Sequence, residues 1–124
     1  MTPEQFIREY ETSGRKGLDY TLSLIDDNAV YWFSDGTKHA GKSEIERVFR
    51  RNFDAIKDET YRISDIVWLA QSAELAACIF RFDWSGILHG APASGSGRGT
   101  IILARRGDSW TIVHEHLSKG EHAA

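Results

Sequence analysis

The chain has 124 residues, of which 27% are charged and 41% hydrophobic, with a formal net charge of −3. This length predicts one domain, spanning 1–124, that buries enough apolar surface to fold without a disulfide or a structural metal. The mild charge, and the lack of Lys/Arg clusters interleaved with aromatic residues, exclude a typical nucleic-acid-binding protein.

Targeting and redox signals are sparse in this sequence. Cys78 is the only cysteine, so no intrachain disulfide forms, and we expect it to be a small buried hydrophobe. No basic segment followed by an apolar stretch opens the chain, and no apolar run approaches the roughly 20 residues that span a bilayer. We therefore expect a cytoplasmic protein with no membrane partner.

The first part of the chain predicts two helical segments. Thr2 and Gln5 match a capping box around Pro3, which suits the first helical position. A second helical segment begins near Leu18 and is expected to end at residues 26–28. The β-branched and aromatic residues 29–33 then predict a strand, and a turn follows it.

The clearest helix begins after Gly41. Ser43 and Glu46 match a second capping box, and apolar residues then recur at helical spacing through residue 56. Arginines and a lysine lie off this apolar stripe and are expected to face solvent.

The second half of the chain predicts an extended meander. Strands are expected over residues 60–69, 75–88, 98–106 and 110–118, with a Gly/Ser/Ala/Pro loop over 89–97 and a frayed tail over 119–124. Helices followed by a run of strands predict an α+β fold with a curved antiparallel sheet around the N-terminal helices. The concave side of such a sheet is a default ligand site.

The most specific stretch is the W-x-I-x-H-x-H-x-S pattern of residues 110–118. It resembles the last strand of SnoaL-like domains, within the superfamily of nuclear transport factor and ketosteroid isomerase folds, and also the end of the association domain of calmodulin-dependent kinases. Residues 41–45 and 98–103 are also typical of SnoaL-like domains. The resemblance covers nearly the whole chain and implies a cone-shaped fold, an internal pocket and commonly a homodimer through the outer sheet face.

Strict alternation would divide the last strand into two faces. Trp110, Ile112, His114, His116 and Ser118 would share one face, and Thr111, Val113, Glu115 and Leu117 the other. Periodicity does not say which face is buried. The resemblance implies that Val113, Glu115 and Leu117 point into the pocket with Ile101, while His114 and His116 point outward to a dimer partner.

Glu115 would then be a carboxyl group in an apolar cavity, which suits a general acid or base. The alternative is a structural ion pair with an arginine. Arg81 and Asp83 follow an apolar strand face, and an arginine in that place fits recognition of an anionic ligand. The alternative there is a local pair of Arg81 with Asp83 or with Glu115; Arg98 is a weaker candidate for binding the anion.

Aromatic residues complete the candidate pocket. Tyr31 and Phe33 share one face of the first strand, and Tyr10 lies on the first helix. Phe33 and Ile101 fall where ketosteroid isomerases carry their two catalytic acids, and Tyr10 lies only near the position of the catalytic tyrosine. We therefore reject ketosteroid isomerase activity itself.

No metal or cofactor is predicted. His114 and His116 share a face, but two imidazoles do not make a zinc site. The sequence has no phosphate-binding loop, and the glycines at 95, 97 and 99 lead into a strand rather than a helix.

Two functions remain open at this point. The first is a small-molecule-binding protein, with acid/base chemistry of the isomerase, cyclase or dehydratase type on an apolar ligand with a polar or anionic head. The second is a non-catalytic homodimeric module whose pocket is vestigial or regulatory.

Overall fold

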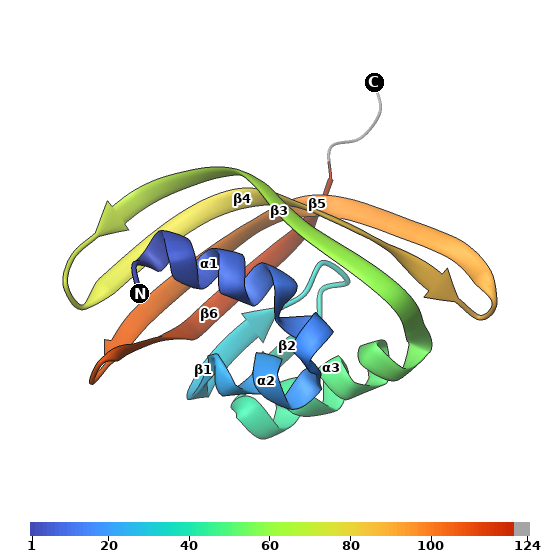
Figure 1. Ribbon diagram of the computed structural model, residues 1–124, viewed down its shortest axis with the longest axis horizontal. Helices are drawn as coiled ribbons and strands as arrows, with labels where there is room; N and C mark the ends of the chain where they lie inside the picture. Colours follow the sequence, from blue (N-terminus) through green and yellow to red (C-terminus); the bar gives the residue numbers. More distant parts are fainter. Residues whose placement is uncertain (121–124) are drawn as a thin grey trace.

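The computed structural model describes residues 1–120 and shows an α+β fold (Figure 1). The elements in chain order are α1 (Pro3–Thr12), the 3₁₀ helix η1 (Ser13–Lys16), α2 (Leu18–Ser23), β1 (Ile25–Trp32), β2 (Lys38–Ala40), α3 (Lys42–Ala55), β3 (Ile56–Gln71), β4 (Leu75–Leu88), β5 (Ala91–Arg106) and β6 (Ser109–Lys119). The expected class is confirmed, although β1 already includes residues 26–28, which were expected to end a helix.

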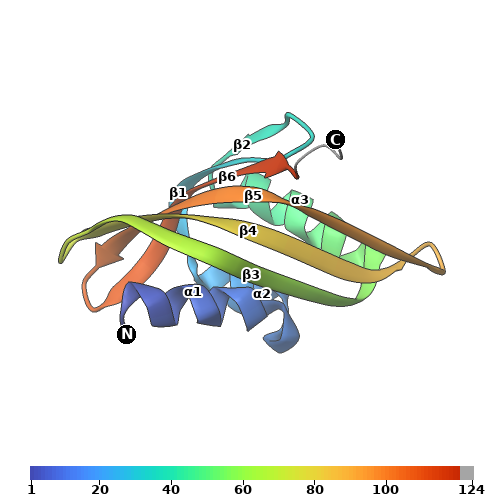
Figure 2. The ribbon, with the colours of Figure 1, turned by 90° about the horizontal axis from the view of Figure 1, so that it is seen from above.

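The strands form one curved sheet in the order β2-β1-β6-β5-β4-β3. Neighbouring strands are antiparallel except β1 and β6, which run parallel and join distant parts of the chain. The sheet arches over the helices, which all lie on its concave side (Figures 1 and 2). The core fills the space between them, with Ile7, Tyr31, Ile45, Ile101 and Ile112 each at most 1% exposed.

The two predicted capping boxes have different outcomes. In α1, the Thr2 hydroxyl accepts from the Gln5 amide and the Gln5 side chain accepts from the Thr2 amide, as expected. The box predicted from Ser43 to Glu46 is wrong, because the N-cap of α3 is Gly41, two residues before the predicted N-cap at Ser43. There the Glu44 carboxylate instead accepts from the amide of residue 40 at 2.9 Å.

The predicted loop over residues 89–97 is also wrong. Only His89 and Gly90 form the turn between β4 and β5, both with positive φ (52° and 80°), as a tight hairpin requires. The small residues that follow belong to β5, because aromatic rings of β4 cover them. Three alternate cross-strand pairs join an aromatic residue to a glycine: Phe80 with Gly99, Phe82 with Gly97 and Trp84 with Gly95.

Strand β6 contains a β-bulge at Val113. His114 pairs with Ile102 and Ile112 pairs with Leu103, so Val113 has no partner residue on β5. The bulge shifts the alternation of side chains by one residue. Trp110 and Ile112 are therefore buried on the same face as Glu115, and the strict alternation expected for this strand is wrong.

The outer edge of the sheet at β3 is covered by side chains of α1. The amide of Ile63 donates to the Glu11 carboxylate at 2.6 Å, and its carbonyl accepts from the Arg8 guanidinium at 2.7 Å. Arg8 and Glu11 also pair with each other at 3.2 Å. Together they satisfy both backbone groups of Ile63, at one point of an edge that would otherwise be open to another chain.

Candidate functional site

A cavity of about 620 Å³ lies between the concave face of the sheet and the helices. Its mouth is lined by exposed charged residues of η1, the end of α3 and the start of β3: Arg15, Arg51, Asp58 and Glu59. Its inner walls are mostly aromatic and aliphatic side chains: Phe33, Phe49, Tyr61, Phe82, Trp84 and Leu117. This size and lining are typical of small-molecule sites.

Glu115 is the acidic residue at the inner end of this cavity. It is 2% exposed, and burial raises the pKa of its carboxyl to about 8, although a hydrogen bond from Tyr10 acts in the opposite direction. The Tyr10 hydroxyl donates to Oε2 at 3.4 Å. Oε1 is fully buried and has no hydrogen-bond partner among residues 1–120. The expectation that Glu115 points inward is therefore met, and no arginine pairs with it in the described part of the chain.

Two tyrosines, one from α1 and one from β1, form a chain of hydrogen bonds that ends at this carboxyl. The hydroxyl groups of Tyr10 on α1 and Tyr31 on β1 lie 3.1 Å apart. Burial, with the nearby Glu115 charge as a second cause, raises the pKa of both hydroxyls well above 10.0. Both tyrosines therefore keep their protons throughout the physiological range and act as hydrogen-bond donors.

The structure brings together part of the predicted pocket. Tyr10, Phe33, Glu115 and Leu117 line the cavity. Tyr31 is completely buried behind Tyr10 and reaches the site through their hydrogen bond. Ile101 is buried opposite Glu115 in the sheet, and Val113 occupies the bulge; neither lines the cavity.

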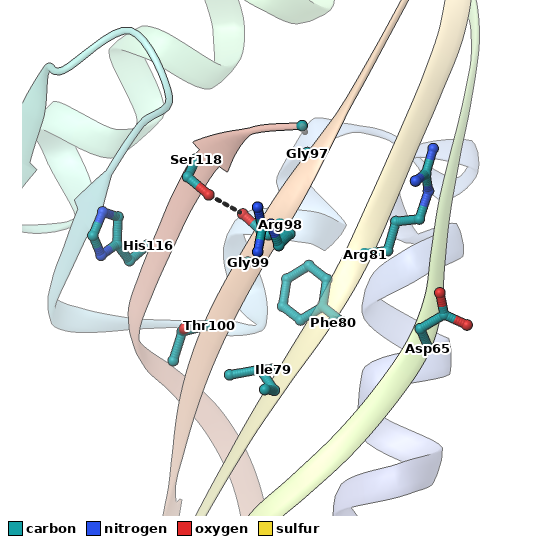
Figure 3. Close-up of a pocket in the computed structure, with 11 residues that line it drawn as sticks. Asp65, Ile79, Phe80, Arg81, Gly97, Arg98, Gly99, Thr100, His116 and Ser118 are labelled. Atoms are coloured by element: carbon teal, nitrogen blue, oxygen red, sulfur yellow. Dashed lines mark hydrogen bonds between the residues drawn. The ribbon is translucent and has the colours of Figure 1, made fainter. Parts of the chain in front are cut away.

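Arg81, Asp83 and Arg98 are not in this cavity, so their expected place in the pocket is wrong. Arg81 and Arg98 are paired residues of β4 and β5 and lie on the outer face of the sheet, where they line a separate groove of about 460 Å³ (Figure 3). Arg81 forms an ion pair with Asp83 at 3.1 Å, one of the two local pairs considered from the sequence. The reason is alternation along β4, which turns Phe80, Phe82 and Trp84 inward and the charged residues outward.

Sequence reasoning missed five aromatic lining residues: Phe49, Phe53, Tyr61, Phe82 and Trp84. For two of them a signal existed in β4. Its even positions from 76 to 84 are unbroken by charge, whereas the odd positions end in Arg81 and Asp83. An unbroken apolar alternation is the better indicator of the buried face of a strand.

His114 and His116 lie on the outward side of β6. Nδ1 of His114 lies 2.7 Å from the carbonyl oxygen of residue 30, and both rings contact Trp32 edge to face. Within residues 1–120, no group of three His, Cys, Asp or Glu side chains is placed to hold a metal ion. Cys78 is fully buried, as expected.

Comparison with known proteins identifies the fold. A family model described as a SnoaL-like domain matches residues 4–120. No curated protein matches the chain. Within the described residues, no helix has the length and apolar content needed to cross a membrane.

Solved structures agree with the family match. The chain is similar to a nuclear transport factor 2-like protein from Salmonella enterica, with 16% identity, a TM-score of 0.83, and coverage of 97% of this chain and 89% of that one. A ketosteroid isomerase-like protein from Erwinia carotovora has 20% identity, a TM-score of 0.74, and coverage of 96% and 94%. A Xanthomonas campestris protein, proposed to be an association domain of calcium/calmodulin-dependent kinase II, has 15% identity, a TM-score of 0.77, and coverage of 97% and 84%. At these identities the likeness shows the fold alone.

Proposed function

Because the chain belongs to the SnoaL-like domain family, we propose that its function lies in the central cavity, where it binds a small, largely apolar molecule and exchanges a proton with it through Glu115. The reaction would be of the isomerase, cyclase or dehydratase type. Fold alone does not select among these, so the proposal depends on the chemistry of the site.

The observation that supports this function is the state of Glu115. A carboxyl group with a pKa of about 8 holds its proton at pH 7 in most molecules and is ionised in about a tenth of them. Such a group donates a proton to a ligand oxygen in one form and accepts a proton from a ligand carbon in the other. General acids and bases work best when their pKa lies near the working pH.

Hydrogen exchange on a bound ketone tests the proposed proton transfer. Small aromatic and alicyclic ketones, lactones, alcohols and carboxylates are first screened by thermal unfolding, where a ligand at 100 times its Kd adds about 2.7 kcal/mol of stability. Each ketone that binds is then incubated with the protein in D₂O, and deuterium uptake next to its carbonyl is followed by NMR. We expect Glu115→Gln to slow this uptake by about 100-fold or more, since general acid–base catalysis contributes at least that much.

The matched control is Glu46→Gln, which changes the same side chain on the surface of α3. It should leave both the thermal shift and the deuterium uptake unchanged. The proposal fails if no compound of the panel stabilises the protein, or if Glu115→Gln exchanges deuterium as fast as the wild type.

A second candidate function, assembly into a homodimer, is supported by the outer face of the sheet. Trp32 on β1, Val67 on β3 and Ile79 on β4 are 41%, 53% and 39% exposed there. His116 packs its ring against Trp32 on the same face. Exposed apolar groups gathered on one sheet face are typical of a protein–protein contact.

A further inference from the structure

Two histidines on the outer face of the sheet form half of a metal site. We propose that His114 and His116 bind zinc, or a divalent transition metal of the same ligand preference, together with the same two residues of a second copy of the chain. The metal then bridges two chains across the outer faces of their sheets. This inference rests on the proposed homodimer and does not involve the cavity.

The hydrogen bond of His114 leaves one of its ring nitrogens free to bind a metal. Nδ1 lies 2.7 Å from the carbonyl oxygen of Val30, and because a carbonyl only accepts, Nδ1 carries the proton. Nε2 is then the unprotonated nitrogen, and it is the ring nitrogen farther from the strand. Among residues 1–120 it has no hydrogen-bond partner. Histidines that bind metals are oriented in the same way, by a hydrogen bond from the other ring nitrogen to a backbone carbonyl.

A tryptophan holds the two imidazole rings beside each other. The ring centroids of His114 and His116 lie 6.3 Å apart, and the Trp32 ring contacts them edge to face at 5.4 and 5.2 Å. These three distances make a triangle, so the Trp32 ring does not separate the imidazoles. Two imidazoles bound to one tetrahedral zinc ion have centroids roughly 5 Å apart. The exposed His116 side chain reaches that distance by a movement of about 1 Å.

A second copy supplies the ligands that one chain lacks. Structural zinc sites have four protein ligands, and one chain contributes two histidines here. Within residues 1–120, no third His, Cys, Asp or Glu side chain joins them. In a two-fold contact both chains present the same surface, so each ligand occurs twice. Two copies therefore give a site of four histidines, and the argument against zinc from the sequence applies to a single chain.

The histidine pair lies within the apolar patch that supports the homodimer. One row of cross-strand neighbours runs over five strands, from Val67 on β3 through Ile79, Thr100 and His116 to Trp32 on β1. His116 is thus flanked by exposed apolar side chains on both sides, with Thr100 next to it on the outer face (Figure 3). Residues near the axis of a two-fold contact face their own counterparts. An axis through this row brings the two histidine pairs together.

Zinc binding and chain mass are measured on the full chain after metal has been removed with EDTA and the EDTA dialysed away. Calorimetric titration with zinc chloride should give one ion per two chains. In sedimentation velocity, the Kd of the dimer should fall by about tenfold or more when zinc is present, because a ligand that binds only the dimer stabilises it. Cobalt(II) in place of zinc should give the intense visible absorption of a tetrahedral site.

Three variants separate a bridging site from other zinc binding. His116→Asn removes an exposed ligand and should abolish both zinc binding and the effect of zinc on the dimer. Its matched control is His89→Asn in the β4–β5 turn, where asparagine tolerates the positive φ, and this variant should behave like the wild type. Ile79→Lys changes no ligand but should also weaken zinc binding about tenfold or more, because the site is complete only in the dimer.

The outcomes distinguish the metal site from the homodimer itself. One zinc ion bound per single chain, or zinc binding that survives in His116→Asn, would overturn the bridging site. A dimer whose Kd does not respond to zinc would also overturn it and would leave the homodimer proposal standing. A protein that stays a single chain with and without zinc would remove both proposals, and the cavity proposal would be unaffected.

Discussion

Protonation of Glu115 is coupled to folding, because the buried carboxyl holds its proton more strongly than the same group in an unfolded chain. Its pKa is about 8 in the folded protein, against an ordinary value of 4.5. Between these values the folded state keeps the proton that the unfolded state releases. The stability that Glu115 contributes is fully present below pH 4.5, falls as the pH rises, and is lost above about pH 8.

Comparison of Glu115→Gln with the wild type isolates the pH-dependent contribution of this carboxyl to the free energy of unfolding. A neutral amide does not titrate, so the free energy of unfolding of the variant, minus that of the wild type, should rise between pH 5 and pH 8 by roughly 1 kcal/mol per pH unit. Urea unfolding at half-unit pH steps measures it. Parallel profiles for the two proteins would mean that the carboxyl titrates normally.

The packing around Gly97 leaves no room for a side chain. A Cβ at this position would lie 2.0 Å from the carbonyl oxygen of Ser118 and 2.6 Å from the Phe82 ring. Because a backbone oxygen cannot move aside cheaply, we expect Gly97→Ala to lower the free energy of unfolding by about 1–3 kcal/mol.

Gly14 provides the control for this substitution. No atom lies within 4 Å of the place where its Cβ would be, and its φ is negative. Gly14→Ala should therefore leave thermal unfolding nearly unchanged. Equal effects of the two substitutions would show that Gly97 is not confined by Ser118 and Phe82.

At the level of single elements, α1 both covers the core and protects the free edge of β3 at Ile63. Removing the carboxylate in Glu11→Ala leaves the partly buried Ile63 amide without its acceptor, which should cost about 1–3 kcal/mol of stability. The Ile63 amide should also exchange with solvent faster, as hydrogen-exchange NMR would detect.

Two further variants show whether the loss of stability in Glu11→Ala comes from its contact with the Ile63 amide. Glu11→Gln retains an acceptor for the Ile63 amide and should lose less stability than Glu11→Ala. Glu46→Ala removes a surface carboxylate that pairs with Arg50 and should cost less than about 1 kcal/mol. Unchanged exchange at Ile63 in Glu11→Ala would contradict a protective role of α1 at this edge.

Several elements were predictable because their signals are local. The capping box of Thr2 and Gln5 defines the start of α1, and the apolar spacing from Ile45 predicts α3. Strand β5 was not predictable in full, because glycine and serine usually mark loops. Here the glycines are strand residues that lie beneath the rings of Phe80, Phe82 and Trp84, and that contact is not visible in either segment alone.

The candidate site was predictable only in part for a similar reason. Glu115 was placed in the pocket by family resemblance, and the structure puts it there. An arginine after an apolar run fits anion binding, and that pattern predicts Arg81 in the same pocket. The choice between the two faces of β4 depends on which side the helices cover, and that is a property of the assembled fold.

At the scale of the whole molecule, each face of the sheet corresponds to one of the two proposed functions. The concave face holds the cavity, and the outer face presents Trp32, Val67 and Ile79. If the outer face forms the proposed homodimer, light scattering at tens of micromolar should give twice the chain mass of 14.0 kDa. Ile79→Lys should shift the protein to single chains, because a charge would be buried at the contact.

The dimer prediction has its own control on the opposite side of the molecule. Asp54→Lys changes an exposed residue near the end of α3 and should leave the mass unchanged. A wild-type mass of one chain would remove the homodimer proposal and would leave the cavity proposal untouched.

The bulge at Val113 has a consequence for comparing this chain with its relatives. It decides on which side of the sheet Glu115 emerges, since one residue fewer between Ile112 and Glu115 would turn the carboxyl to the outer face. A sequence alignment that closes this position with a gap would therefore equate an internal acid with an external residue. Relatives that share the chemistry of Glu115 are better recognised by the number of residues that separate the acid from the preceding Trp-x-Ile than by identity at the acid position.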